Sequence, residues 1–238
     1  MRNRNCQRGF ALAAWRAAVG VWVLAAGWAP LDSAIAQAAP AVDLGYFKLT
    51  YYHVALEGPA KAPERADWPI YSQDCAQVIA LTTRAFHHEL SLEGTGLLRD
   101  GRLINFEERC GCARPGFRDT RSCYVELDRK KFPWGRGARL NDAYLPLRPL
   151  ASVAVDPELI PIGSMMFLPG LAGKSGPGGD TLSGCFRAED TGSAITGKRL
   201  DLFTGHPAWT RWMQRTHGLE RIRVVLNSPR CSARGNGK

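Results

Sequence analysis

The sequence lacks an apolar run long enough to cross a membrane. The uncharged stretch near its start, from Ala17 to Leu31, is shorter than the roughly 20 residues that a transmembrane helix needs. Arg2, Arg4 and Arg8 precede this stretch and Ala34-Ile35-Ala36 follows it, which is the layout of a secretory signal with small residues at the cleavage position. We interpret residues 1–36 as a cleaved signal peptide, with an uncleaved anchor as the alternative. The mature protein is then expected to be exported to the periplasm or the extracellular space, with no membrane span.

The chain also lacks a paired Cys-x-x-Cys motif and histidines with the spacing of metal ligands. One of its seven cysteines, Cys6, lies in the predicted leader, and the other six are an even number in an exported chain. Such a set favours up to three disulfides in an oxidising compartment, although the sequence leaves the pairing open. The alternative is a zinc site built on Cys110 and Cys112. We expect disulfides, no metal and no cofactor.

No clustered basic helix and no nucleic-acid reading motif is present, so we expect no nucleic-acid partner. The chain is nevertheless basic, and loss of the leader, with four arginines and one aspartate, lowers its formal charge from +9 to +6. In an exported protein this charge indicates an anionic polymer or a membrane surface as partner. There is no internal repeat, and the mature length suits one substantial domain.

Alternation and turn signals predict a mainly β protein with few helices, folded as a closed or nearly closed barrel. We expect a linker at 37–45, the barrel domain at 46–230 with a Cys-rich excursion at 110–140, and a tail at 231–238. The Asp100-Gly101 pair predicts a hairpin. The expected strands lie at 46–56, within 150–170 and at 185–190, 198–203 and 222–227, and the expected helices lie at 75–90, with Asp74 as N-cap, and at 205–218.

Three aspartates occupy related places in the predicted strands. Asp156 and Asp190 each end a strand, and Asp201 lies within a strand between Leu200 and Leu202. Desolvation and mutual repulsion would raise the pKa of at least one of them, as general-acid chemistry requires. The alternative is structural: Asp156 starts a turn before a proline, and Asp190 caps a loop. Asp201 has no turn to serve and is costly to bury without a function.

The segments VAVDPELIPIGSMMFLPG, AEDTGSAITGKRLDLFTG and LEGTGLLRDGRLINF resemble the three-aspartate (3D) domain. They are also similar to the membrane-bound lytic transglycosylase A family. The resemblance extends to LTYYHVALE and WPIY near the front and to GHPAWTRWMQRTHGLERIRVVLN near the end, so it covers nearly all of the mature chain. It implies a six-stranded double-psi β-barrel with a few peripheral helices.

The resemblance also implies an activity. It makes Asp201 the catalytic residue, with Asp190 and Asp156 lining the same site, for cleavage of the β-1,4 bond between N-acetylmuramic acid and N-acetylglucosamine without water. Peptidoglycan glycan strands are then the partner of a protein that we expect to be monomeric. The matching segments supply the candidate substrate-binding residues Tyr52, Glu57, Thr95, Asn105, Thr191 and Lys198. For Tyr52 and Asn105 the alternative is structural: the tyrosine packs the barrel, and Asn105 finishes a hairpin.

The chain departs from this pattern in two places. Gly192-Ser193-Ala194-Ile195-Thr196-Gly197 stands where family members commonly have Gly-Gly-Ala-Ile-Lys-Gly, so the loop cation is missing. Two alternatives follow: Lys198 or Arg199 replaces this cation, or the site binds sugar differently. The 110–140 excursion is also too short to supply the second domain of the larger relatives, which predicts a shallower groove. Inverting hydrolysis by two acids, a glycan hydrolase of other specificity, and a non-catalytic wall-binding barrel are the alternatives.

Overall fold

The computed structural model describes residues 39–59, 64–218 and 220–232 of the 238-residue chain. The predicted signal peptide at 1–36 lies outside the described residues, and so do residues 233–238 of the predicted tail. The predicted linker at 37–45 is too long, because the first strand begins at Val42. Within the described ranges, no helix combines the length and the apolar character needed to cross a membrane.

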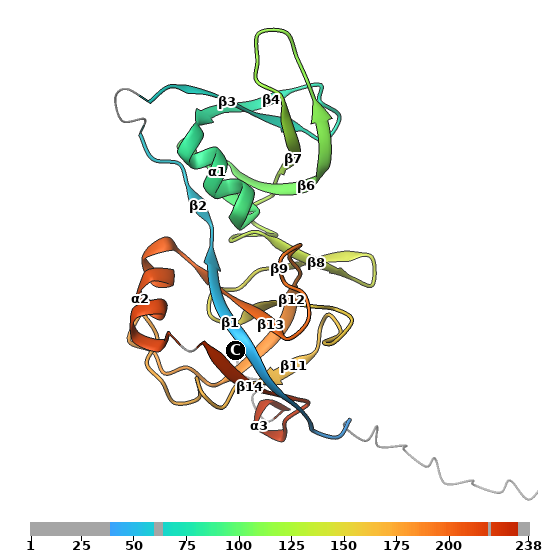
Figure 1. Ribbon diagram of the computed structural model, residues 1–238, viewed down its shortest axis with the longest axis vertical. Helices are drawn as coiled ribbons and strands as arrows, with labels where there is room; N and C mark the ends of the chain where they lie inside the picture. Colours follow the sequence, from blue (N-terminus) through green and yellow to red (C-terminus); the bar gives the residue numbers. More distant parts are fainter. Residues whose placement is uncertain (1–38, 60–63, 219, 233–238) are drawn as a thin grey trace, which may run out of the picture. The chain divides into compact units, whose positions relative to one another are not determined.

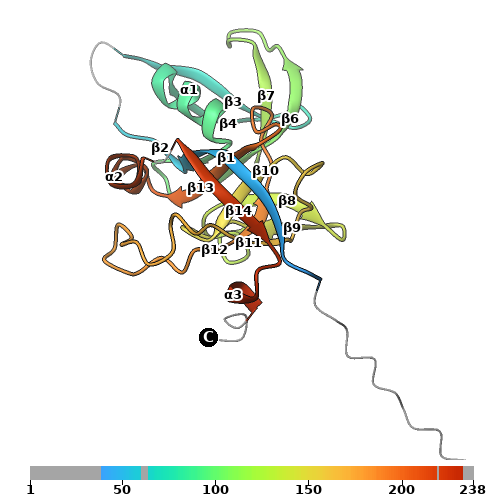
Figure 2. The ribbon, with the colours of Figure 1, turned by 60° about the horizontal axis from the view of Figure 1, so that its bottom comes forward.

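Six strands close into a barrel in the order β1-β13-β10-β12-β11-β14, which Figures 1 and 2 show from two sides. β1 runs parallel to β13, and β10 runs parallel to β12. The other four neighbouring pairs are antiparallel. The mainly β prediction is therefore confirmed. The barrel strands are β1 (Val42–His53), β10 (Ser152–Val155), β11 (Met165–Phe167), β12 (Cys185–Asp190), β13 (Arg199–Gly205) and β14 (Arg221–Leu226).

The barrel core is built by alternate residues of these strands. Leu200 and Leu202 of β13 are fully buried in it, together with Leu49 and Tyr51 of β1. Because successive side chains of a strand point to opposite faces, Asp201 points out of this core. Its face of the barrel is covered by a second apolar cluster that includes Phe203 and, packed against it, Tyr52. The strand pattern thus places Asp201 on the outer face of the barrel, beneath other parts of the chain.

A second sheet of six strands, in the order β2-β5-β6-β7-β3-β4, is built from residues 55–126. The expectation of one barrel over 46–230 is wrong for this segment, which leaves the barrel after β1 and returns at β10. Helix α1 packs on this sheet through Phe86 and Leu90, and the two elements share a core of their own. The strands are β2 (Ala55–Leu56), β3 (Ala66–Ser72), β4 (Val78–Thr83), β5 (Thr95–Leu97), β6 (Leu103–Cys112) and β7 (Thr120–Glu126).

The helix predicted at 75–90 begins later than expected. Residues 78–83 are strand β4, paired antiparallel with β3, and the helix α1 spans Arg84–Glu93. Its N-cap is Thr83, whose hydroxyl accepts the Phe86 N–H at 3.2 Å, and not Asp74. The run from 78 to 83 ends in two threonines and is rich in β-branched residues, which favour a strand. The apolar residues of this segment also have helical spacing, which is why the sequence pattern predicted a helix here.

Three disulfides are present, which confirms the prediction from the cysteine count. Cys75–Cys112 and Cys110–Cys123 lie together at one end of the second sheet, and Cys185–Cys231 ties β12 to the short helix α3 (Pro229–Ser232). The first four sulfurs lie within 4.8 Å of one another, close enough to hold a metal ion. They are engaged in disulfides, so the structure favours the oxidised pairing over the zinc alternative. Cys231 is part of the fold and not of a tail.

A short hairpin of β8 (Arg136–Leu140) and β9 (Ala143–Pro146) joins the two sheets. β8 passes very close to β12: a Cβ atom added to Gly137 would lie 2.0 Å from the backbone oxygen of Glu189. Only glycine permits this approach. About half of the predicted 110–140 excursion is thus regular structure, since it holds the end of β6, all of β7 and the first strand of this hairpin.

Other local predictions are confirmed. The chain turns at Gly101, whose N–H donates to the Leu98 carbonyl, and β5 and β6 pair antiparallel across this turn. Helix α2 spans Pro207–His217 with proline in its first turn, and it contacts β1 and β13. Its position on the outside of the barrel is visible in Figure 1.

Candidate active site

Two of the three predicted aspartates lie in one row across the barrel wall. Asp201 pairs with Thr50 of β1 on one side and with Ala154 of β10 on the other. Ala154 in turn pairs with Asp190, after a register shift between Val153 and Ala154. Only the small Ala154 therefore separates the two acids in the sheet. The row brings together residues that are far apart in the sequence.

The carboxyl of Asp201 is only partly exposed, and its Oδ1 atom is buried with no hydrogen-bond partner among the described residues. Burial raises the pKa of Asp201 to about 6, although Thr50, Arg199 and His53 each lower it by less. A buried polar atom without a partner is rare in folded proteins and calls for an explanation. Such a carboxyl is partly protonated near neutral pH and free to exchange its proton with a ligand.

Asp190 is held by two hydrogen bonds. The Tyr52 hydroxyl donates to its Oδ2 at 2.7 Å, and the Thr191 backbone N–H donates to its Oδ1 at 2.8 Å. Burial raises the pKa of Asp190 to about 6; the two hydrogen bonds oppose this rise and the charge of Asp201 adds to it. Burial, the charge of Asp190 and its hydrogen bond hold the pKa of Tyr52 well above 10, so Tyr52 is a neutral donor.

Three residues that sequence reasoning did not select complete the cluster. The His53 backbone N–H donates to Glu93 Oε2 at 2.8 Å, and the His53 imidazole lies 3.0 Å from Glu89 Oε1 and 3.0 Å from Thr210 Oγ1. Burial raises the pKa of Glu93, and the charges of Asp201 and Glu89 raise it further, against the opposing contacts of His53. Glu89 and Glu93 stand four residues apart, hence on one face of α1. No sequence motif links this face to the barrel.

Asp156 takes the structural role that the sequence left open. Its Oδ1 accepts the Glu158 N–H at 3.0 Å, and its Oδ2 accepts the Gly197 N–H at 2.6 Å. These bonds hold the turn after β10 and tie it to the loop between β12 and β13. Among the described residues, no hydrogen bond or ion pair joins Asp156 to Asp190 or Asp201. The structure therefore brings two of the three acids into direct neighbourhood.

Thr95 and Asn105 are buried and bonded to each other and to the backbone. The Thr95 hydroxyl donates to Asn105 Oδ1 at 2.7 Å, and the same oxygen accepts the Arg136 N–H at 3.2 Å. Glu57 accepts the Arg99 N–H at 2.9 Å, and only 6% of its side chain is exposed. These three predicted substrate-binding residues connect the second sheet to its own loops and to the β8–β9 hairpin, so their polar groups are engaged within the protein.

The two cations after the loop differ in where they point. Lys198 Nζ donates to the Leu44 carbonyl at 2.9 Å and lies 5.8 Å from the centre of the Phe47 ring, near the start of β1. Arg199 donates to the Ala194 carbonyl at 3.1 Å, and its charge lowers the pKa of Asp201. Of the two predicted replacements for the missing loop cation, Arg199 is the one that acts on Asp201.

Comparisons with known proteins place this site in a family domain. The model of the 3D domain matches residues 151–212, which include Asp156, Asp190 and Asp201. Residues 151–212 are therefore a 3D domain, and the prediction of that domain is confirmed. No curated protein matches the chain.

Solved structures of lytic transglycosylases are similar at low identity. E. coli MltA with bound chitohexaose is 15% identical with a TM-score of 0.47, and the match covers 76% of this chain and 71% of that one. A membrane-bound lytic murein transglycosylase from Agrobacterium tumefaciens is 15% identical with a TM-score of 0.47, covering 78% and 75%. Lytic transglycosylase LtgG of Burkholderia pseudomallei is 17% identical with a TM-score of 0.41, covering 76% and 71%.

Proposed function

We propose that this protein is a peptidoglycan lytic transglycosylase that uses Asp201 as both general acid and general base. The observation that carries the proposal is the state of Asp201: a carboxyl in a 3D domain, with a pKa of about 6 and one buried oxygen that has no hydrogen-bond partner in the described part of the chain. A general acid works best when its pKa lies near the working pH. The choice of peptidoglycan as the substrate class rests on the 3D domain.

In the proposed reaction, protonated Asp201 gives its proton to the oxygen that links N-acetylmuramic acid to N-acetylglucosamine. The glycosidic bond breaks, and positive charge develops at C1 of the muramyl ring. Ionised Asp190 stabilises this charge, as carboxylates do in glycosidases. The Asp201 carboxylate then takes the proton of the muramyl 6-hydroxyl, whose oxygen bonds to C1 and closes a 1,6-anhydro ring. Asp201 ends protonated, so the proton balance closes without water.

The neighbours of the two acids have positioning roles in this scheme. Tyr52, neutral and 2.7 Å from Asp190, stabilises the ionised form of that carboxyl. The charge of Asp201 raises the pKa of the nearby Glu93, because two ionised carboxyls repel each other. His53 contacts Glu89 and Glu93 and supplies the opposing charge when it is protonated. Because both aspartates have a pKa of about 6 and like charges repel, the pair can hold one proton between them near that pH.

We further propose the finer features that the resemblance implies for the whole protein. These are a double-psi topology, removal of residues 1–36, export to the periplasm or beyond, and action as a monomer on glycan strands. The two parallel strand pairs, β1/β13 and β10/β12, support the topology. The three disulfides support an oxidising compartment.

Glycoside hydrolysis is the second candidate, because Glu93 gives the site a further carboxyl beside Asp201. In an inverting hydrolase a second carboxylate activates water. A barrel that binds the wall without cutting it is the non-enzymatic alternative. A hydrolase would add water at the cleaved bond, and a binding protein would release no fragments of the wall.

Release of dye from labelled, purified sacculi tests the proposal. We expect Asp201→Asn to lower the rate by at least about 10²-fold, because the general acid is lost. Asp142→Asn is the matched control: its side chain is fully exposed, and its φ of 63° is one that asparagine tolerates. Full activity of Asp201→Asn would remove Asp201 from the mechanism, and binding of the wild type without dye release would support the non-enzymatic alternative.

A further inference from the structure

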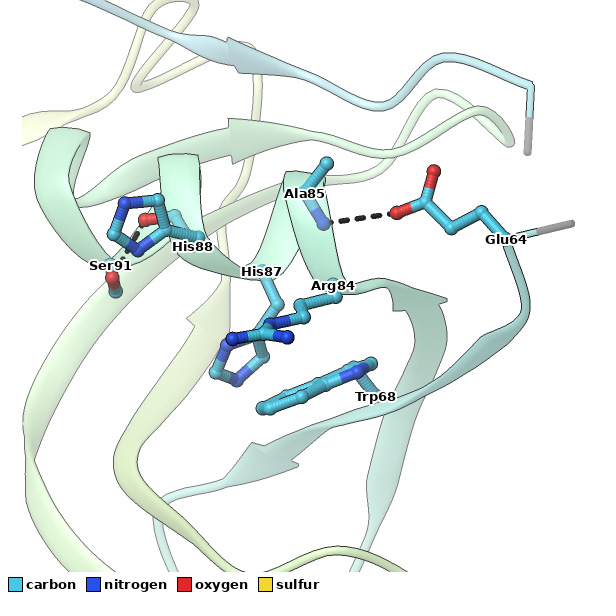
Figure 3. Close-up of a pocket in the computed structure, with 7 residues that line it drawn as sticks. All are labelled: Glu64, Trp68, Arg84, Ala85, His87, His88 and Ser91. Atoms are coloured by element: carbon cyan, nitrogen blue, oxygen red, sulfur yellow. Dashed lines mark hydrogen bonds between the residues drawn. The ribbon is translucent and has the colours of Figure 1, made fainter. Parts of the chain in front are cut away.

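A second site candidate lies on the face of α1 that points away from the aspartates. It is a pocket of about 510 Å³ between this helix and strand β3, within the range of small-ligand sites. Figure 3 shows the side chains that line it, which are Glu64, Trp68, Arg84, Ala85, His87, His88 and Ser91. The helix residues among them recur at three- and four-residue spacing and so share one face, opposite Glu89 and Glu93. The pocket is therefore separate from the Asp201 cluster.

This pocket holds an arginine that has no counterion among the residues that the structure describes. The Arg84 guanidinium lies 5.9 Å from the centre of the Trp68 ring, a cation–π distance. Arg118 also lies over Trp68, at 4.9 Å, but it is paired with Asp67 at 3.0 Å. In the described part of the chain, no carboxylate and no carbonyl contacts the Arg84 guanidinium. Its planar set of donors is thus available to an anion.

A buried nitrogen of His87 points to a ligand as well. The Nε2 atom is buried and has no hydrogen-bond partner among the described residues. Burial, and then the charge of His88, lower the pKa of His87 below 6.5, so the ring is neutral near pH 7 and can donate or accept one hydrogen bond there. The centre of the His87 ring lies 5.2 Å from the centre of the Trp68 ring, and Figure 3 shows it beside Arg84. One uncommitted cation and one uncommitted polar atom share the pocket.

Other polar groups of the pocket are already engaged. Glu64 Oε1 accepts the Ala85 N–H at 3.1 Å, and the Ser91 hydroxyl donates to the His88 carbonyl at 2.7 Å; both bonds are drawn in Figure 3. These contacts fix the rim and leave the Arg84 end free. A ligand that suits this arrangement carries a carboxylate for Arg84 and, next to it, a hydroxyl or amide for His87.

We propose that this pocket binds a carboxylate group of the peptidoglycan substrate, with Arg84 as its counterion and His87 Nε2 bonded to an adjacent hydroxyl or amide. This inference rests on the proposed function for the choice of polymer, and it adds a binding site outside the cleavage site. Peptidoglycan offers carboxylates from two sources. One is the lactyl group of muramic acid in strands without peptides, and the other is the stem peptide.

Nuclear magnetic resonance of the Trp68 indole N–H and the His87 ring reports on this pocket alone. The mature protein carrying Asp201→Asn, which prevents turnover, is titrated with three probes. They are a peptide-free tetrasaccharide of alternating N-acetylglucosamine and N-acetylmuramic acid, a free stem tetrapeptide, and neutral chitotetraose. We expect saturable shifts of both signals with at least one of the two carboxylate probes and none with chitotetraose. The probe that binds identifies the source of the carboxylate.

The substitution Arg84→Gln should then weaken binding of the active probe by about tenfold or more, because a charge-assisted contact is lost. Arg121→Gln is the matched control. Arg121 is an exposed arginine of β7, in the sheet that also contains β3, and it does not line the pocket. Thermal unfolding of both variants verifies the fold. Equal shifts with chitotetraose, no shift with any probe, or an unchanged affinity of a folded Arg84→Gln protein would each overturn the proposal.

The two proposals fail separately. If dye release survives Asp201→Asn, the catalytic assignment is lost, while the titration of the pocket still stands. If dye release depends on Asp201 but the Trp68 and His87 signals do not shift with either carboxylate probe, only the pocket proposal is lost.

Discussion

At the residue scale, the chemistry depends on two carboxyls whose pKa values are both raised to about 6 by burial but whose hydrogen bonds differ. Asp201 has a buried oxygen without a partner, whereas both oxygens of Asp190 accept hydrogen bonds. A hydrogen bond to a carboxylate stabilises its ionised form. Asp190 is therefore suited to remain charged beside a developing cation, and Asp201 is suited to carry the proton.

Tyr52→Phe tests this division of roles. Loss of the phenol removes a contact that lowers the pKa of Asp190, so this pKa should rise above about 6. If ionised Asp190 is required, the acid limb of the pH–rate profile moves to higher pH and the rate at pH 6 falls about tenfold, while the alkaline limb is unchanged. Dye release between pH 4 and pH 9 measures the profile. Tyr46→Phe, an exposed tyrosine, is the control, and a profile identical to this control would contradict the role of Tyr52.

A second prediction at this scale concerns stability. The pKa of Asp201 is about 6 in the folded protein and 3.8 ordinarily, so the folded state holds this proton more tightly than the unfolded state. Stability must therefore fall as pH rises from about 4 to about 6, and the loss is complete above that range. Asp201→Asn removes this loss and should raise Tm at pH 7, with the gain disappearing below about pH 4. A change in Tm that is the same at pH 4 and pH 7 would show that ionisation of Asp201 does not destabilise the fold.

At the element scale, the site depends on contacts between elements, and sequence patterns do not predict these contacts. α1 brings Glu89 and Glu93 to His53 at the end of β1, across about 40 residues of chain. The β8–β9 hairpin bridges the second sheet and β12 through Gly137. The sequence places Asp201 within a strand between Leu200 and Leu202, but nothing local predicted which elements would cover its face of β13.

The substitution Gly137→Ala tests the bridge. The added Cβ would lie 2.0 Å from the Glu189 oxygen, so β8 must move away from β12. We expect a loss of about 1–3 kcal/mol in the free energy of unfolding, as for other overpacked positions. Gly111→Ala, where a Cβ meets no atom within 4 Å, should change stability by less than about 0.5 kcal/mol. Denaturant unfolding measures both, and equal values for the two variants would mean that the close approach does not hold the sheets together.

At the scale of the whole molecule, the sequence predicted the barrel half of the fold better than the other half. Strands at 185–190 and 199–205 and the helix at 207–217 follow clear periodic patterns. The sheet built from 55–126 was missed because its strands pair over long distances, as β3 does with β7, and because two disulfides replace part of a continuous core. The sequence likewise identified Asp190 and Asp201 but missed Glu93 and His53, since their neighbourhood exists only after the two sheets meet.

The central claim is that one aspartate acts twice and that water takes no part in cleavage. Digestion of purified sacculi in water labelled with oxygen-18, followed by mass spectrometry of the soluble muropeptides, tests it most directly. The account predicts 1,6-anhydro-muramic ends without the heavy isotope, and none of these products from Asp201→Asn. Reducing muramic ends that carry oxygen-18 would contradict it and would identify the protein as a hydrolase.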